Sequence, residues 1–263
     1  MTYRDQRRLP TLLLAVSAIF FGVSYFTVRF PDVPGASVAS YAATVAIALP
    51  AFVALFRYLG VGRGALALLV LSVFGYGIEG LGVATGFPYG TFYYGEALGP
   101  KLLGLAPYIL PVSYVPLVIG AVAATGSRSL VAWVLKSALL LTLMDGVLDP
   151  GAASLGFWIW PDGGPYYGVP VSNYLGWIFS GALASGLLLA AGRWNAAPLP
   201  GLLDSSIIAI AFWTGISVFS LLPIPALLGA VLFVYLLRRR SHLRRRISHT
   251  TGRAGGYKLG AGF

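Results

Sequence analysis

The sequence contains no cysteine and only two histidines. Without thiol groups the chain cannot form disulfides, use a thiolate nucleophile, or bind a metal or iron–sulfur cluster through cysteine. The histidines, His242 and His249, both lie in a basic C-terminal segment. This placement disfavours a buried histidine general base and a multi-histidine metal site, so we expect no metal site.

Charged residues are also scarce. They make up 10% of the chain, 57% is hydrophobic, and the mean hydropathy is +0.81, whereas a soluble domain usually carries about 25% charged residues. The apolar residues form stretches of roughly 17 to 22, the length that crosses a hydrocarbon core about 30 Å thick. The sequence therefore predicts an all-α, polytopic transmembrane helix bundle.

About eight spans are expected. Pro223 and Pro225 leave open whether the last two are separate helices or one kinked element, which would give seven. The first apolar run superficially resembles a signal peptide, but it is long for one and lacks a small-x-small cleavage site, so we interpret it as a retained helix. The expected spans lie near residues 11–29, 38–57, 65–84, 106–124, 130–148, 171–191, 204–222 and 224–237.

The positive charges predict the orientation of the bundle. Most lysines and arginines lie at alternate span ends, and the opposite connections contain only Arg29 and Lys101. By the positive-inside rule both termini should be cytoplasmic, and two aromatic loops, 85–105 and 149–170, should be external. The net charge of +10 is thus explained by topology rather than by a basic face, and no nucleic-acid partner is expected.

Two regions follow from this pattern. Residues 1–237 form a single transmembrane domain. Residues 238–263 form a basic cytoplasmic tail, which we expect to be disordered and attracted to anionic lipid.

Four of the eight carboxylates stand out from the sequence. Glu79 and Asp145 lie well inside expected spans, where an ionised side chain costs several kcal/mol unless it faces a bundle interior or cavity. Asp149 is four residues after Asp145 and shares its helix face. With Glu96, these carboxylates point to the half of the membrane beneath the two aromatic loops.

Structural interpretations compete with a functional one. Glu79 could accept hydrogen bonds from neighbouring Tyr or Ser side chains and have no other role. Asp149 precedes Pro150 and could simply shape the exit from a helix, and Glu96 could be a solvated loop residue. The glycines around Glu79 are explained most economically by close helix packing.

The combination of carboxylates and aromatic rings suits proton chemistry on an apolar substrate. Burial, or a neighbouring carboxylate, lets a carboxyl group act as a general acid near neutral pH. Aromatic faces stabilise a cation by about 0.5–2 kcal/mol each. An acid beside an aromatic pocket is what protonation of an isolated C=C bond requires.

The motifs that carry this chemistry resemble the integral-membrane carotenoid hydratase family, of the bisanhydrobacterioruberin hydratase and carotenoid 1′,2′-hydratase type. The resemblance covers roughly residues 70–180 and rests on GYGIEGLGVATGFPYGTFYY, ALGPKLLGLAPYILPVSY, DGVLDP, FWIW and GPYYGVPVSNYLGW, in this order. It implies a cofactor-independent hydro-lyase of the cell membrane that adds water to terminal isopropylidene bonds of a C50 carotenoid. The implied partners are this long apolar substrate, the lipid bilayer and other carotenoid-biosynthesis enzymes.

We expect the acid/base set to be Glu79, Asp145 and Asp149. Side chains expected to position water or protons are Glu96, Tyr89, Tyr93, Tyr94, Tyr166 and Asn173; those expected to line a cationic pocket are Tyr76, Trp158, Trp160 and Trp177. We also expect the aromatic loops to fold back over the ends of the third and fifth spans, because they join turn-forming residues to apolar rings.

Two other functions remain open from the residues alone. A proton-coupled secondary transporter would also bury carboxylates, although transporters tend to show internal repeats and a site near mid-membrane. A non-catalytic carotenoid-binding protein would have less need of several carboxylates together.

Overall fold

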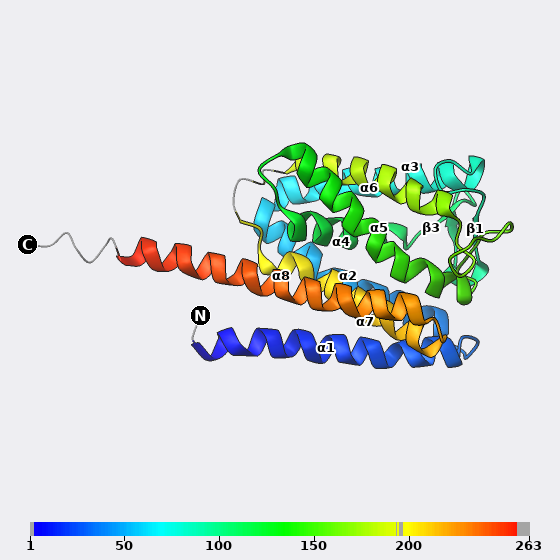
Figure 1. The fold of residues 1–263 in the computed structure, drawn as a ribbon, viewed down its shortest axis with the longest axis horizontal. Coiled ribbons are helices and arrows are strands. Elements are labelled where there is room, and N and C mark those ends of the chain that lie inside the picture. The colour runs from blue at the N-terminus through cyan, green and yellow to red at the C-terminus, as the bar shows by residue number, and fades with distance from the viewer. Residues whose placement is uncertain (1–2, 193, 195–196, 257–263) are drawn as a thin grey trace, which may run out of the picture.

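The computed structural model describes residues 3–192, 194 and 197–256. Within them the chain forms eight α-helices, and the loops between α3 and α4 and between α5 and α6 carry four two-residue strands (Figure 1). The helices are α1 (Tyr3–Arg29), α2 (Ala36–Leu59), α3 (Val61–Thr85), α4 (Leu110–Thr125), α5 (Leu130–Ser154), α6 (Val171–Ala191), α7 (Asp204–Phe219) and α8 (Pro223–Gly256). The strands are β1 (Tyr93–Tyr94), β2 (Lys101–Leu102), β3 (Ala106–Pro107) and β4 (Trp158–Ile159), and the 3-10 turns are η1 (Glu96–Leu98) and η2 (Pro200–Leu203).

The expected all-helical fold is confirmed, but the described residues contain six candidate membrane spans rather than the expected eight or seven. Of the described residues, six helical stretches are long and apolar enough to cross a membrane: Thr11–Arg29, Ala36–Leu59, Val61–Thr85, Leu130–Ser154, Val171–Ala191 and Pro200–Phe219. The last two expected spans are separate helices, because α7 ends at Phe219 and α8 begins at Pro223. Proline suits the first position of a helix, where its missing N–H has no partner to lose.

Helix α4 is shorter than expected and lies at the centre of the bundle. It begins at Leu110 rather than near 106, because Ala106 and Pro107 form strand β3. Its 16 residues span only about 24 Å, less than a hydrocarbon core of about 30 Å. Every residue from Tyr114 to Ala124 is buried, so neighbouring helices rather than lipid surround it.

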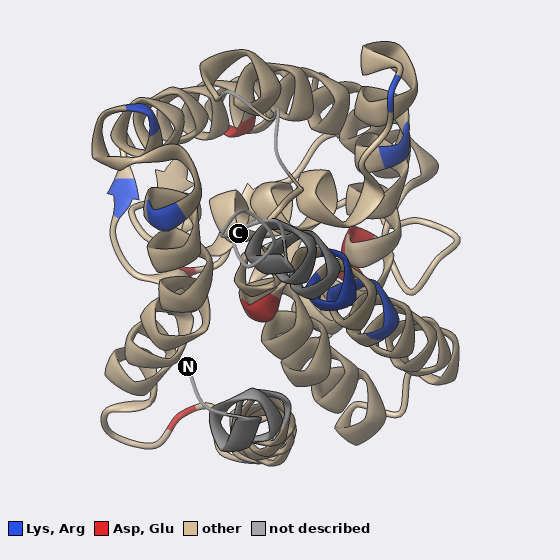
Figure 2. Ribbon diagram, turned by 90° about the vertical axis from the view of Figure 1, so that its left-hand side faces the viewer, with Lys and Arg blue, Asp and Glu red and all other residues tan. Residues whose placement is uncertain are grey.

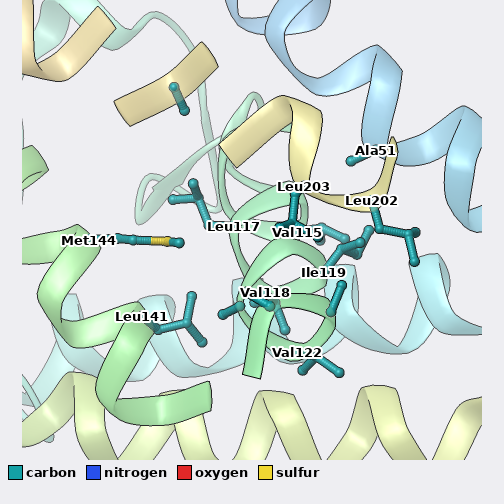
Figure 3. Packing of buried hydrophobic residues seen from close by; sticks show 14 of the residues in the cluster. Ala51, Val115, Leu117, Val118, Ile119, Val122, Leu141, Met144, Leu202 and Leu203 are labelled. Carbon is teal, nitrogen blue, oxygen red and sulfur yellow. The ribbon is translucent and has the colours of Figure 1, made fainter. Parts of the chain in front are cut away.

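The largest hydrophobic core is built around this helix. Figure 3 shows Val115, Val118 and Ile119 of α4 packed beside Leu202 and Leu203 of η2, with Leu141 and Met144 of α5 approaching from the other side. Helices α2, α3, α5, α6 and α7 all contact α4. Helix α1 packs mainly against α7 and lies at the edge of the bundle (Figure 1).

Helix α5 continues past the point where a span end was expected. It runs through Pro150 to Ser154 instead of ending near residue 148. A proline inside a helix leaves the carbonyl four residues earlier without its usual N–H donor. Here that carbonyl belongs to Gly146, and the Tyr166 hydroxyl donates a hydrogen bond to it at 3.2 Å. Asp149 therefore lies inside the helix rather than at its exit.

The two aromatic loops pair with each other at one end of the bundle. Strands β1 and β4 are antiparallel, with Tyr93 opposite Ile159 and Tyr94 opposite Trp158. Figure 1 shows strand β1 at the end of the bundle opposite to the start of α1 and the end of α8. Figure 2 views the molecule from the terminal end, where lysine and arginine positions occur on several helices and gather along α8.

The basic C-terminal segment differs from expectation. A disordered tail was expected from residue 238, but α8 continues as a helix to Gly256. Arg240 is buried and forms an ion pair with Asp204 at the start of α7, at 2.5 Å, while Arg239 donates to the Ala124 carbonyl at 2.7 Å. These contacts fix the first turns of the basic segment against α4 and α7.

Candidate functional site

Three of the predicted carboxylates lie together inside the bundle. Glu79 on α3 and Asp145 and Asp149 on α5 are 5%, 4% and 3% exposed, and they interact with one another electrostatically. We call these three residues the carboxylate cluster. Helix α6 packs against both α3 and α5, and this arrangement brings the two carboxylate-bearing helices to one site.

The side chain of Asn173, in the first turn of α6, bridges the two aspartates. Its Nδ2 donates to Asp145 Oδ2 at 3.2 Å and also to Asp149 Oδ2. Because Asp145 and Asp149 are one helical turn apart, a single amide on the neighbouring helix can reach both. Asn173 is itself 3% exposed, so its N–H groups are directed to the carboxyl groups rather than to solvent.

The paired loops supply two further donors. The Tyr94 hydroxyl donates to Glu79 Oε2 at 2.8 Å, and Trp158 Nε1 donates to Asp149 Oδ1 at 2.9 Å. Tyr94 and Trp158 face each other across the β1–β4 pair, so a single strand pairing positions both. Burial raises the pKa of the Tyr94 hydroxyl well above its usual range, which keeps this group a donor. The expected folding of the loops over α3 and α5 is confirmed by these contacts.

Aromatic rings enclose the site on the loop side. Phe92 packs edge-on against Tyr94 and Tyr89, with ring centroids 5.5 and 5.9 Å apart, and lies 6.1 Å from Trp160. Trp158 lies 6.2 Å from Trp213 of α7. The rings of Tyr89, Phe92, Tyr94 and Trp160 belong to one buried cluster, so the carboxyl groups are covered by an aromatic layer.

Some of the predicted residues lie outside this site. The Glu96 side chain is 96% exposed and pairs with Lys101 at 2.7 Å. Tyr93 is 47% exposed, because neighbouring residues of a strand point to opposite faces. The Tyr76 ring packs against the edge of the aromatic cluster, but its hydroxyl donates to the Tyr108 carbonyl at 2.8 Å rather than to a carboxyl group. Tyr166 supports the α5 backbone, as described above.

Four residues that sequence reasoning missed contribute to the site. Tyr114 of α4 and Tyr174 of α6 bring buried hydroxyls near the carboxylate cluster. Phe92 and Trp213 complete the aromatic layer. Phe92, Tyr114 and Tyr174 lie within the motifs quoted above, whereas Trp213 lies outside them and reaches the site only because α7 packs against α5.

In the described part of the chain, no group of three or more His, Asp or Glu side chains is arranged to hold a metal ion. The donors around the cluster are neutral N–H and O–H groups instead. Such a site can hold a proton among its carboxyl groups and exchange it with a bound molecule.

Comparison with known proteins agrees with the resemblance seen in the motifs. A family model described as "Carotenoid biosynthesis protein" matches residues 35–236, a range that contains every residue of the site. A similar protein is bisanhydrobacterioruberin hydratase from Haloarcula japonica, 41% identical over 186 residues.

The match to this relative covers 66% of the present chain and 63% of the relative, so it spans less than two thirds of the relative's length. No solved structure matches the chain. The family match extends over most of the chain and includes the helices that carry the carboxylates. The chain therefore belongs to the carotenoid biosynthesis protein family.

Proposed function

We propose that this protein is a carotenoid hydratase, which adds water to a terminal isopropylidene C=C bond of a C50 carotenoid of the bisanhydrobacterioruberin type. The supporting observation is the buried carboxylate cluster, held by Asn173, Tyr94 and Trp158 under an aromatic layer. The hydratase related to this chain has a name that states the same reaction class.

The first step is protonation of the alkene. Asp149 accepts hydrogen bonds from both Trp158 and Asn173, and such donors favour the ionised form of a carboxyl group. Asp145 accepts one hydrogen bond, from Asn173, and lies beside Asp149. Because close carboxyl groups do not both ionise readily, Asp145 is the member that carries the proton and donates it to the less substituted alkene carbon.

Proton transfer leaves a tertiary cation, which the neighbouring aromatic faces stabilise. Trp158 and Tyr94 adjoin the carboxyl groups, because each donates a hydrogen bond to one of them. Cation–π contacts contribute about 0.5–2 kcal/mol each, more where water is excluded. The apolar polyene lies in the lipid or between the helices, while its end reaches the cluster.

Capture by water completes the addition. The water oxygen forms a C–O bond to the tertiary carbon, and Glu79 accepts the proton that this water releases. Transfer of a proton from Glu79 back to Asp145, within the cluster, restores the starting state. The net reaction adds one water molecule to the alkene and gives a tertiary alcohol. It involves no net oxidation or reduction, so it consumes no redox cofactor.

The function is tested by expressing the chain in a host that makes an unhydrated carotenoid with isopropylidene ends. Mass analysis of the pigments should show a gain of one water per hydrated end, absent with an empty vector. The number of hydrated ends follows from the same spectrum. Unchanged pigments in cells that insert the protein into their membrane would contradict the proposal.

A further inference from the structure

The hydroxyl of Tyr89 occupies an unusual position beside the carboxylate cluster. Tyr89 lies in the loop after α3, yet it is 1% exposed and its ring is inserted between α3 and α6. A Cβ on Gly82 of α3 would lie 2.8 Å from this ring, and one on Gly176 of α6 would lie 2.6 Å from it. The two glycines thus leave the space that the ring fills.

This hydroxyl is surrounded by polar groups but bonded to none. It interacts with Glu79 and with the Ser180 hydroxyl of α6, without completing a hydrogen bond to either. The Ser180 and Tyr114 hydroxyls are likewise buried and unpartnered. Tyr89 and Tyr114 flank the same ring, Trp177, at 6.1 and 5.9 Å, and both interact electrostatically with Glu79.

Buried hydroxyls without partners are rare in folded proteins, because each loses its hydrogen bonds to water without replacement. A buried water molecule typically makes about three hydrogen bonds to polar groups that would otherwise be unsatisfied. The hydroxyls of Tyr89, Ser180 and Tyr114 are three such groups. The Tyr89 hydroxyl interacts with the other two and with the Glu79 carboxylate, which also accepts a hydrogen bond from Tyr94. Each hydroxyl can donate or accept, so the set can orient one water molecule.

We propose that Tyr89, Ser180 and Tyr114 form a subsite that binds and orients the water molecule added to the carotenoid cation, with Glu79 as the group that takes its proton. The proposal rests on the hydratase function proposed above. Asp145 and Asp149, bridged by Asn173, form the proton-donating side of the site, and the Tyr89 subsite forms the water-delivering side. Tyr89, Ser180 and Tyr114 are positioning residues for the water.

The test separates protonation of the alkene from capture of the cation. In D₂O, a cation that is not captured loses a proton and returns to the alkene, with deuterium on the former vinyl carbon. Ser180→Ala and Tyr89→Phe each remove one hydroxyl and keep the bulk of the side chain. The ratio of deuterated recovered alkene to hydrated product should rise about tenfold in each, as expected for one lost hydrogen bond.

Ser185→Ala is the matched control. Ser185 is also buried on α6 with an unpartnered hydroxyl, but it lies more than a turn beyond Ser180. The ratio of deuterated alkene to hydrated product in Ser185→Ala should equal that of the wild type. The subsite would be overturned if both Ser180→Ala and Tyr89→Phe kept the wild-type ratio of deuterated alkene to hydrated product. Slower hydration without more deuterium in the recovered alkene would overturn it as well.

A second measurement does not depend on activity. If the Ser180 hydroxyl binds a buried water molecule, Ser180→Ala removes one hydrogen-bond partner of that water and should lower the thermal unfolding midpoint of the protein. A truly unsatisfied hydroxyl, by contrast, can be deleted without loss, so Ser185→Ala should not lower it. Equal unfolding midpoints for Ser180→Ala and Ser185→Ala would overturn the subsite, whether or not the wild type hydrates a pigment. Absence of hydration by the wild type would contradict the proposed function instead.

Discussion

At the scale of single residues, the donors around the carboxylate cluster come from three different elements. Asn173 belongs to α6, Tyr94 to β1 and Trp158 to β4. Each is a neutral group that donates to one or two carboxyl oxygens. None of these three donors is charged, so a proton held among the carboxyl groups limits the negative charge of the buried cluster.

Replacing one carboxyl group of the cluster by its amide should nearly abolish hydration. Asp145→Asn and Glu79→Gln keep size and polarity but remove the exchangeable proton, and loss of an acid/base group commonly lowers a rate by about 10²- to 10⁴-fold. Pigment conversion per unit of membrane-inserted protein measures this effect. Glu96→Gln is the control, because Glu96 is a solvent-exposed carboxylate; wild-type activity in the first two variants would contradict the acid/base roles.

Adjacent tyrosines in β1 allow a matched comparison. Tyr94→Phe removes the donor to Glu79, a hydrogen bond to a charged group that contributes about 1.5–3 kcal/mol. Hydration should therefore fall by about tenfold or more. Tyr93→Phe removes a hydroxyl from the exposed face of the same strand and should leave the rate unchanged; equal rates in the two variants would mean that Tyr94 does not support the reaction.

At the scale of elements, the glycines on α3 make room for both a neighbouring helix and a loop. The sequence favoured close helix packing, and Gly75 does lie against the Tyr114 side chain of α4. Gly82, in contrast, faces the rings of Tyr89 and Phe92 from the loop after α3. The α3 surface is thus shaped to receive the aromatic loop that covers the site.

Adding a methyl group at Gly82 should disturb this contact. The Cβ of Gly82→Ala would meet Tyr89 at 2.8 Å and Phe92 at 3.0 Å, and overpacking of this kind costs about 1–3 kcal/mol. A lower unfolding midpoint and slower hydration are expected. Gly77→Ala, on the same helix with nothing within 4 Å of the new Cβ, should be neutral or slightly stabilising, since alanine is the better helix former.

Besides its packing on α5 and α7, helix α8 is joined to α7 by the ion pair between Arg240 and Asp204. Asp204→Asn or Arg240→Ala would leave the other group charged without its partner. Breaking a fully buried pair costs about 3–5 kcal/mol, and this pair is partly solvated, with side chains 10% and 19% exposed. We expect a loss of about 2–3 kcal/mol by thermal or denaturant unfolding, and no loss for the exposed control Arg238→Ala.

At the scale of the whole molecule, α1 begins and α8 ends on one side of the bundle, and the aromatic loops lie at the other end (Figure 1). An even number of helices that cross the bundle produces this arrangement. It is compatible with the orientation predicted from the positive charges. The carboxylate cluster then lies towards the membrane face covered by the loops.

Reporter fusions can test the orientation. A reporter after Arg63 or Arg128 should read cytoplasmic, because lysines and arginines concentrate on that side. A reporter within residues 85–105 or 151–168 should read external. A cytoplasmic signal from either aromatic loop would reverse the orientation and place the site at the inner leaflet.

The sequence by itself determined the membrane class, the helical fold and the three carboxylates of the cluster. These follow from local properties: the length of apolar runs, the cost of burying a charge, and the shared helix face of Asp145 and Asp149. The same local properties misplaced the end of α5, because a helix can continue through Pro150 once Tyr166 satisfies the Gly146 carbonyl.

Only the tertiary structure decided which polar groups meet. Glu96 was expected beside the cluster but lies at the surface, whereas Tyr114 and Ser180 were not expected and bring buried hydroxyls near Glu79 or Tyr89. Contacts of this kind join side chains far apart in the chain, and they depend on how helices pack and on which strand of one loop pairs with the other. No local spacing encodes those choices, because the free energy that selects them comes from the assembled core.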